Sequence, residues 1–339
     1  MNVLIMTAIY PTEENPAFGS FVYTQVKALE RSGIRVEVLV LGGRFRKLIY
    51  LKGISELRRR LAAGKFDVVH AHYSYVGMIA RTQWRAPVVV TFHGDDLLGT
   101  INGRGTKTFS SGIIVRAGKK LAEHCDAAIV QSPEMAAKLK KSNVYVIPHE
   151  IDLDLFKPVD REQARSALGL NKNWKYLLFA ANPRIPVKRF SMAKAVADSL
   201  AESDPSVHLV TVYKEPQQRL ALYMSACDVL VFPSYQEGSP NVVKQAMACN
   251  LPIVATDVGD VRQVIGGSEG CYVCAPNVAE LAARVTAILA SCRRTTGRDQ
   301  VRHLDCPRVS ARVIDVYENV LRRNRAPGLS QANLFSHTK

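Results

Sequence analysis

The chain has 339 residues and a formal net charge of +15, with 45 Lys and Arg against 30 Asp and Glu. Its length predicts about two domains, at roughly 150 residues each. No apolar run reaches the ~18 residues that a membrane-spanning helix needs. The charge bears on partners and not on the fold, and it fits nucleic acid, an anionic membrane surface or a phosphorylated substrate.

The first half of the chain alternates short apolar runs with longer amphipathic segments. The start, MNVLIMTAIYP, lacks a basic region and a cleavage site, so we interpret it as a first strand and not as a signal peptide. A loop with Gly19, a helix from Phe21 and a second strand follow, which is the beginning of a doubly wound α/β domain. The crossover rule makes the sheet parallel. The predicted strands span residues 3–8, 34–41, 67–71, 87–92, 127–131 and 144–147.

A second strand–helix series begins near Lys175, after a linker at residues 148–158. We therefore predict an N-terminal Rossmann-like domain over residues 1–155 and a C-terminal one over 156–311. A final helix at about 312–325 is expected to return to the first domain. The predicted strands of the second domain span residues 177–181, 208–213, 229–232, 252–256 and 271–274.

The segment from Arg44 to Lys65 carries eight Lys or Arg and one acid, with bulky apolar residues between them. One interpretation is a solvated crossover helix. The other is a face that binds an anionic membrane surface or the acceptor, because dense positive charge mixed with apolar groups suits interfacial binding. A second basic stretch, residues 102–120, is predicted to be a loop followed by a helix.

His93 follows the fourth strand, in Thr91-Phe92-His93-Gly94. Ligands of open α/β sheets bind beyond the carboxyl ends of strands, so His93 is a candidate substrate-facing residue, although it could simply cap the strand. His70 and His72 share one face of the third strand, and we expect them to be structural. Asp95-Asp96 is not an Asp-x-Asp metal motif. Cys271-x-x-Cys274 has no second pair and no His at ligand spacing to complete a zinc site, so we expect no metal at either place.

The loop after the strand at 229–232 has the parts of an anion site. Ser239 is predicted to cap a helix with Pro240 at its first position. The exposed amides at such a helix start, together with the dipole, attract phosphate, and Gly238 lets a ligand approach closely. Glu237 lies beside this site. The helix is expected to end near Asn250, which tolerates the left-handed conformation.

Cations follow the first strand of the second domain, at Arg184, Lys188 and Arg189. They could form a fork for phosphate or belong to a solvated charged loop. The anion site at the corresponding edge of the same sheet favours the phosphate interpretation.

These motifs resemble a known family. Arg184 and Lys188, the run Glu237-Gly238-Ser239-Pro240-Asn241-Val242-Val243 and the strand at 252–256 are similar to the nucleotide-sugar half of the group 1 (family 4) retaining glycosyltransferases. Gly19, His93 and the linker resemble the first half of the same family. The resemblance implies a GT-B fold, in which two Rossmann-like domains face each other across a cleft, and a metal-independent hexosyltransferase of polysaccharide or glycolipid biosynthesis.

By this resemblance, Glu237 and His93 are the catalytic residues. The donor diphosphate would be bound by a set of side chains and backbone amides: Arg184, Lys188, Gly19, Ser239, Asn241, Val242 and Val243. The resemblance implies no cofactor and no metal, because cations and a helix dipole stabilise the departing diphosphate. The expected partners are a nucleotide-sugar donor and a glycan or lipid-linked acceptor.

Two positions depart from the family pattern. Gln245 stands where a second Glu usually binds the ribose hydroxyls, so Gln245 is the ribose-binding candidate without the charge-assisted bond. His149-Glu150 replaces a common Asn-Gly, which predicts a different local loop.

The resulting prediction is a retaining glycosyltransferase in the cytoplasm, peripheral on the inner face of the membrane. The odd number of cysteines, seven, fits a reducing compartment. A nucleotide-sugar epimerase or hydrolase on the same fold is the alternative. A basic polyanion-binding protein is a further one, although no nucleic-acid recognition motif is present and no nucleic acid is expected as a partner.

Overall fold

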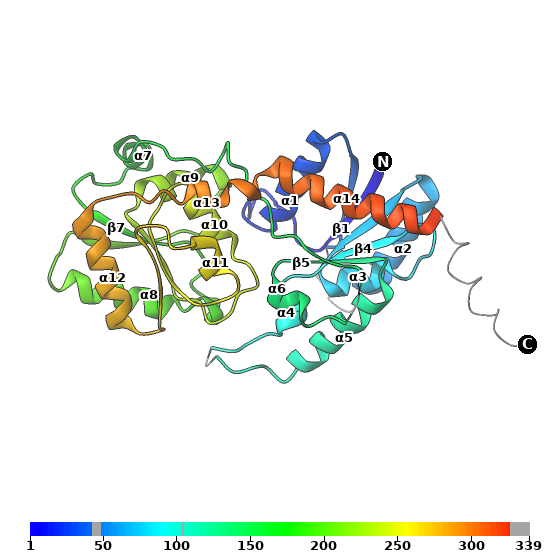
Figure 1. Cartoon of the computed structure of the whole chain (residues 1–339), viewed down its shortest axis with the longest axis horizontal. Coiled ribbons are helices and arrows are strands. Elements are labelled where there is room, and N and C mark those ends of the chain that lie inside the picture. Colours follow the sequence, from blue (N-terminus) through cyan, green and yellow to red (C-terminus); the bar gives the residue numbers. More distant parts are fainter. Residues whose placement is uncertain (43–48, 104, 141, 326–339) are drawn as a thin grey trace, which may run out of the picture.

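The computed structural model describes residues 1–42, 49–103, 105–140 and 142–325 (Figure 1). Two parallel sheets with strand orders β2-β1-β3-β4-β5-β6 and β11-β10-β9-β7-β8 form the centres of two α/β domains. Every predicted strand is present, so the expected fold class of two doubly wound Rossmann-like domains is confirmed. Short apolar runs were sufficient to find these strands because helices cover both faces of each sheet.

The first sheet is buried between two layers of helices. On one face pack α2, α3, α4, α5 and α6, and on the other α1 and α14. The strands are β1 Asn2–Thr7, β2 Arg35–Val40, β3 Val68–His72, β4 Val88–Thr91, β5 Ala127–Val130 and β6 Val144–Val146. The helices are α1 Ser20–Arg31, α2 Ile49–Ala63, α3 Ser74–Ala80, α4 Gly94–Leu98, α5 Ser111–His124 and α6 Pro133–Ala136.

The second sheet has α8 and α12 on one face and α9, α10 and α11 on the other. Its strands are β7 Lys175–Phe179, β8 Val207–Thr211, β9 Val229–Phe232, β10 Ile253–Thr256 and β11 Cys271–Cys274. The helices are α7 Arg161–Leu168, α8 Phe190–Ala201, α9 Gln217–Ala226, α10 Asn241–Ala248, α11 Val261–Ile265, α12 Val278–Ser291, α13 Arg298–Val301 and α14 Cys306–Arg325, with short 3-10 turns η1 Pro186–Lys188 and η2 Arg302–Leu304.

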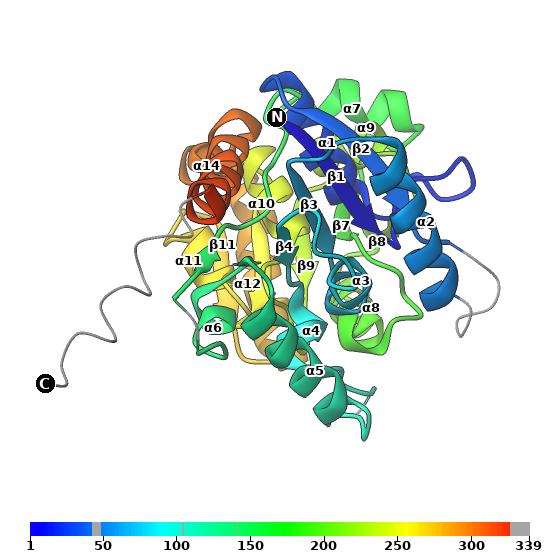
Figure 2. The same ribbon diagram turned by 90° about the vertical axis from the view of Figure 1, so that its right-hand side faces the viewer.

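Helix α14 starts at Cys306, earlier than residue 312, and crosses back to the first domain (Figures 1 and 2). Val309, Val313, Val316 and Tyr317 on one helical face pack with α1 and the first sheet. The two chain crossings lie side by side, because the Ile151 N–H donates to the Leu304 carbonyl at 2.8 Å. The domains are therefore joined by two adjacent, hydrogen-bonded segments of the chain and not by a single linker.

The basic segment from Arg44 to Lys65 forms helix α2 from Ile49 onwards, and its first residues lie outside the described part of the chain. Leu57 and Leu61 pack in the core of the first domain. Arg60 pairs with Glu37 and Glu56. The apolar face of this helix is thus explained by packing, as the crossover interpretation expects. No helix in the described ranges is long and apolar enough to cross a membrane.

Candidate active site

A cavity of about 500 Å³ lies between the domains. Its walls come from loops that follow the carboxyl ends of strands in both sheets, at Tyr73, His93 and Gln131 on one side and at Asn182 and Glu237 on the other. This is the position at which open α/β sheets bind ligands. Of the predicted site residues, six line this cavity: His93, Lys188, Glu237, Ser239, Asn241 and Val242.

Glu237 and Lys188 form an ion pair in this cavity, with Lys188 Nζ 2.6 Å from Glu237 Oε1. The loops that carry them are tied together, since the Tyr235 N–H donates to the Val187 carbonyl at 2.9 Å. The side chains are 26% and 14% exposed, so the pair is reachable by a ligand yet partly screened from water. An anion and a cation are therefore held together where a charged substrate could enter.

Asp95 faces the same cavity and was not predicted as a site residue. Burial raises the pKa of its carboxyl, the nearby Glu237 raises it further and Lys188 lowers it. Asp95 is thus electrostatically coupled to the Glu237–Lys188 pair. Its place directly after His93-Gly94 was the available signal in the sequence.

His93 enters the cavity from the start of α4, where its backbone N–H donates to Asp96 Oδ2 at 2.9 Å. Its Nδ1 lies 3.2 Å from His149 Nε2. Its Nε2 is buried and has no hydrogen-bond partner within the described ranges. Burial, followed by the neighbouring His149 and His72, lowers the pKa of His93 well below its usual range, so the ring is neutral at pH 7. A neutral ring with one unsatisfied nitrogen can bind a hydroxyl group.

His93 belongs to a column of stacked imidazoles. Ring centroids are 4.7 Å apart for His70 and His72, 5.6 Å for His72 and His93, and 5.1 Å for His93 and His149. His70 is bonded on both sides, to Tyr317 at 2.6 Å and to Thr91 at 2.7 Å, which confirms its structural role. His149, at a position that departs from the family pattern, was not predicted as a site residue.

The anion-site helix α10 begins one residue later than predicted. Pro240, with φ −73° and ψ 115°, is the N-cap, and Asn241 is the first helical residue. Ser239 is not the cap, because its hydroxyl donates to Asp260 and accepts from Lys244, each at 2.5 Å. The helix ends as expected, with Asn250 in the left-handed region at φ 53°.

The start of α10 still presents polar groups to the cavity. Asn241 and Val242 line it, and Asn241 Oδ1 is buried without a partner among the described residues. Val243 instead packs in the core, and its N–H donates to the Pro240 carbonyl at 3.2 Å.

Two buried ionisable groups lie behind this wall and were missed from the sequence. Lys244 is fully buried, and burial lowers its pKa to about 8, against the attraction of Asp260 and Glu150. Burial raises the pKa of the Glu150 carboxyl to about 7. The sequence gives no sign that either residue is buried, because both side chains are charged and neither lies in a recognisable motif.

Two other predicted diphosphate ligands, Arg184 and Gly19, lie away from the cavity lining. The Arg184 side chain is exposed, and its backbone N–H donates to Asn182 Oδ1 at 3.0 Å. Arg189 stacks over Tyr235 at 4.2 Å. Gly19 caps α1 with φ 68°, and a Cβ there would lie 2.5 Å from the Ile9 carbonyl oxygen. Gly19 is thus required by its own loop, whatever it does for a ligand.

Gln245 lines a smaller cavity of about 210 Å³, next to the first. The two cavities share four lining residues, Phe21, Ala180, Asn241 and Val242, so the smaller cavity extends the larger one. The Gln245 side-chain amide donates to Gln217 Oε1 at 2.9 Å. Its carbonyl oxygen is the group that could accept from a ligand hydroxyl.

The two domains touch at glycines beside Glu237. A Cβ on Gly238 would lie 3.1 Å from Met135 Sδ and 3.2 Å from Gly94 Cα, both in the first domain. The two backbones can approach this closely only because both residues are glycines, so the two domains are in direct contact at this point. No cluster of three or more His, Cys, Asp or Glu side chains that could hold a metal occurs within the described ranges.

Comparisons with known proteins agree with this geometry. A family model described as "Glycosyltransferase Family 4" matches residues 18–155, and one described as "Glycosyl transferases group 1" matches residues 166–291. The matches cover both domains and both walls of the cavity.

Curated relatives include a D-inositol 3-phosphate glycosyltransferase from Mycobacterium marinum, 28% identical over 67% of this chain and 56% of that protein. The chain thus spans little more than half of that relative. A putative teichuronic acid biosynthesis glycosyltransferase, TuaC, from Bacillus subtilis is 24% identical over 84% of this chain and 88% of that protein.

Solved structures share the fold. Sucrose-phosphate synthase from Thermosynechococcus elongatus superposes with a TM-score of 0.80 at 20% identity, covering 95% of this chain and all of that one. HepE from Anabaena, solved in complex with UDP, superposes with a TM-score of 0.68 at 16% identity, covering 94% and 100%.

Proposed function

This chain belongs to the group 1, family 4 glycosyltransferases of GT-B fold, and from that premise we propose that it is a retaining hexosyltransferase. It would move a sugar from a nucleoside diphosphate sugar to a hydroxyl of a glycan or lipid-linked acceptor. The observation that carries this proposal is the Glu237–Lys188 pair, which lines one cavity together with the start of α10 and with His93, whose Nε2 has no hydrogen-bond partner among the described residues. Such a site offers groups for a diphosphate, a sugar ring and a hydroxyl at once.

The donor diphosphate would lie between Lys188 and the first amides of α10, at Asn241 and Val242. Lys188 supplies a charge and the helix start supplies N–H groups and a dipole. The nucleoside would extend into the smaller cavity, where the Gln245 carbonyl accepts from a ribose hydroxyl. HepE, with the same fold, was solved with UDP and with UDP-glucose, which supports a nucleotide-sugar donor here.

The chemistry follows from where charge develops. The bond from the anomeric carbon to the diphosphate oxygen breaks, the acceptor oxygen bonds to the same face of that carbon, and the acceptor proton leaves with the diphosphate. Preorganised cations and amides at the departing diphosphate stabilise that charge without a metal ion. Glu237 would bind the sugar ring, and the neutral His93 would accept from or donate to one of its hydroxyls.

A donor screen tests the proposal. Thermal shifts with UDP, GDP, ADP and their sugars should single out one nucleotide, because a ligand that binds only the folded state raises its stability by mass action. Glu237→Ala and Lys188→Ala should each lower kcat/KM for transfer at least about 100-fold, the loss typical of removing one preorganised charge-stabilising group.

Lys194→Ala is a matched control, since Lys194 is exposed on α8 and, among the described residues, pairs only with Asp198. Full activity in either site variant, with the control also active, would contradict the site assignment. Fast turnover of the donor without acceptor would instead favour an epimerase or hydrolase. Steeply salt-dependent polyanion binding without any nucleotide binding would favour the polyanion-binding alternative.

We also propose that the enzyme is cytoplasmic and peripheral on the inner face of the membrane, through helix α2. Its core-facing side is used in packing, but Leu51 is 68% exposed and Arg59 keeps 72% of its side chain exposed. Lys52 and Arg58 are exposed on the same helix. Basic side chains beside an exposed apolar group suit an anionic lipid surface.

A further inference from the structure

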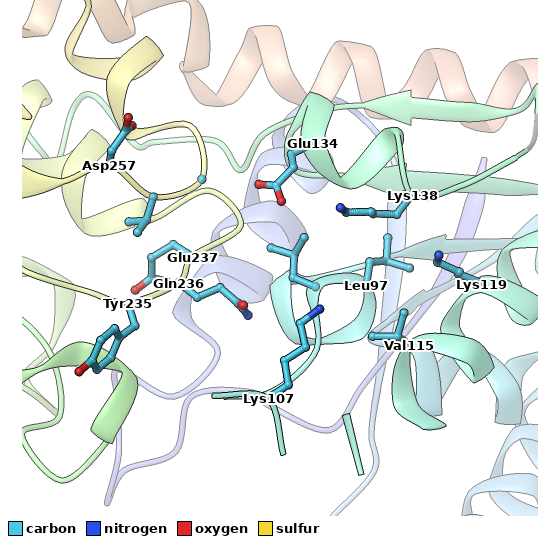
Figure 3. A pocket seen from close by; sticks show the side chains of 13 residues that line it. Leu97, Lys107, Val115, Lys119, Glu134, Lys138, Tyr235, Gln236, Glu237 and Asp257 are labelled. Atoms are coloured by element: carbon cyan, nitrogen blue, oxygen red, sulfur yellow. The ribbon is translucent and has the colours of Figure 1, made fainter. Parts of the chain in front are cut away.

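A second large interdomain cavity, of about 520 Å³, also has Glu237 in its lining (Figure 3). Gln236 and Glu237 border both this cavity and the proposed donor cavity. A molecule in the second cavity can therefore reach the proposed reaction centre at Glu237. The remaining walls of this cavity take no part in the proposed donor site.

Three lysines of the first domain line this second cavity: Lys107, Lys119 and Lys138. None of them forms an ion pair with any residue that the structure describes. Of the acids in the lining, Glu237 pairs with Lys188 and Asp257 pairs with Arg262 at 2.7 Å. Only Glu134 is left to offset the three lysines, so the cavity has an excess of about two positive charges.

The backbone fixes where these lysines stand. Lys107 lies in a loop closed by a bridge between Ile101 and Lys107, and this loop is tied to the second domain because the Gln236 side-chain amide donates to the Gly99 carbonyl at 2.7 Å. Lys119 shares one face of α5 with Val115, one turn earlier, and both line the cavity.

Close packing also brings α5 to the cavity. A Cβ on Gly118 would lie 2.7 Å from the Asp96 carbonyl oxygen, so α5 sits directly against α4. Lys138 follows α6, and in Figure 3 the side chains of Lys107 and Lys138 extend into the space between the two walls. The lysines thus come from three separate segments and converge on one space.

We propose that this lysine cavity binds an anionic acceptor, one that carries a phosphate group within reach of Lys107, Lys119 and Lys138. A phosphate monoester has a charge of about −2 near pH 7, which matches the excess charge of the cavity, and lysine is a flexible point-charge ligand for phosphate. The acceptor hydroxyl would point past Gln236 to Glu237. This inference rests on the proposed function and specifies the chemical class of its acceptor.

The phosphate could belong to a soluble sugar phosphate or to a lipid-linked one. Two exposed apolar side chains lie close in sequence to Lys107 and would suit the lipid-linked form: Phe109 is 98% exposed and Ile113 is 63% exposed. The binding experiment therefore has two arms. One titrates glucose 6-phosphate, with glucose as the neutral comparison. The other uses phosphatidylcholine vesicles with and without an isoprenoid phosphate, with Arg58 and Arg59 changed to Gln in every protein compared, because α2 is itself proposed to bind anionic vesicles.

Both arms use the full chain with the donor site saturated by the nucleoside diphosphate found in the donor screen, so that phosphate cannot bind there instead. We expect glucose 6-phosphate or the isoprenoid vesicles to bind measurably more tightly than their neutral counterparts. Lys107→Gln, Lys119→Gln and Lys138→Gln should each weaken that binding about fivefold, as partly exposed charge-assisted contacts do. The triple variant should abolish the preference for the phosphorylated ligand.

Lys120→Gln is the matched control, because Lys120 is exposed on α5 next to Lys119 but does not line the cavity. It should bind as the unaltered protein does. Equal binding of phosphorylated and neutral ligands in both arms, or a triple variant that keeps the preference, would overturn the inference. Donor binding by the unaltered protein separates the two ideas: its absence contradicts the proposed function, whereas its presence without any phosphate preference contradicts only this inference.

Discussion

At the scale of single residues, some members of the site could be predicted from sequence motifs and others could not. Glu237 and Lys188 belong to motifs with local spacing, and the structure brings them to 2.6 Å. Behind them, His149, Glu150 and Lys244 have no such motif. Glu150 and Lys244 lie within electrostatic range of each other, and burial shifts both pKa values toward neutrality. Such groups make stability depend on pH.

Glu150→Gln tests this. The folded pKa of about 7 lies above the ordinary value of 4.5, so the folded state holds more protons and stability falls as pH rises from about 4.5 to 7. The variant should match the unaltered protein at pH 4, below both pKa values, and be more stable at pH 8 by about 2 kcal/mol, somewhat less than the full shift implies because Lys244 loses its partner.

Denaturant unfolding at the two pH values measures the difference. Glu162→Gln, a control at an exposed carboxylate, should change neither value. A Glu150→Gln variant with the same pH slope as the unaltered protein would show that Glu150 is not a buried, pKa-shifted group.

At the scale of elements, a half-buried arginine holds the second domain to its linker. Arg298 at the start of α13 donates to the carbonyls of Phe156 at 2.6 Å, Leu153 at 2.7 Å and Ala248 at 2.9 Å. These bonds join the linker to the end of α10. Helix α10, whose first residues line the cavity, is thereby fixed relative to the crossing point between the domains.

Arg298→Ala should therefore lower the free energy of unfolding by about 2–4 kcal/mol, because three carbonyls lose a charged donor. For a domain of this size, the melting temperature should fall by about 5–10 °C. Arg302→Ala is the control. The Arg302 side chain is 65% exposed, and its ion pair within the described part of the chain is with Asp299, a contact worth less than about 1 kcal/mol. Equal melting of the two variants would contradict the role given to Arg298.

At the scale of the whole molecule, the ligand cavities exist only because two domains close on each other. Gly94 and Gly238 meet at the interface, and α14 returns from the second domain to pack on the first. Each cavity takes its walls from both domains. Helix α2 lies on the side of the first domain away from the second domain (Figure 1).

Neutralising Arg58 and Arg59 together should weaken binding to anionic vesicles about 30-fold at low salt, since each basic group near such a surface contributes about 1 kcal/mol. Co-sedimentation with phosphatidylglycerol vesicles measures this. A double change of Lys172 and Lys194 to Gln removes the same charge from the second domain and should have no effect. If the unaltered protein does not sediment with the vesicles, the membrane proposal is wrong.

The sequence by itself determined the strands, their division into two series and the donor-side motif from Glu237 to Val242, because each depends on short-range pattern. The spacing of residues along the chain could not predict which distant helix faces and loops would contact one another. Lys188 and Glu237 stand 49 positions apart, and His93 and His149 stand 56 apart. The tertiary structure alone placed Ser239 on Lys244 and Asp260, left Arg184 outside the cavity and gathered three lysines around one space. Those outcomes depend on the packing of distant segments and on burial, which a residue's own neighbours in sequence do not encode.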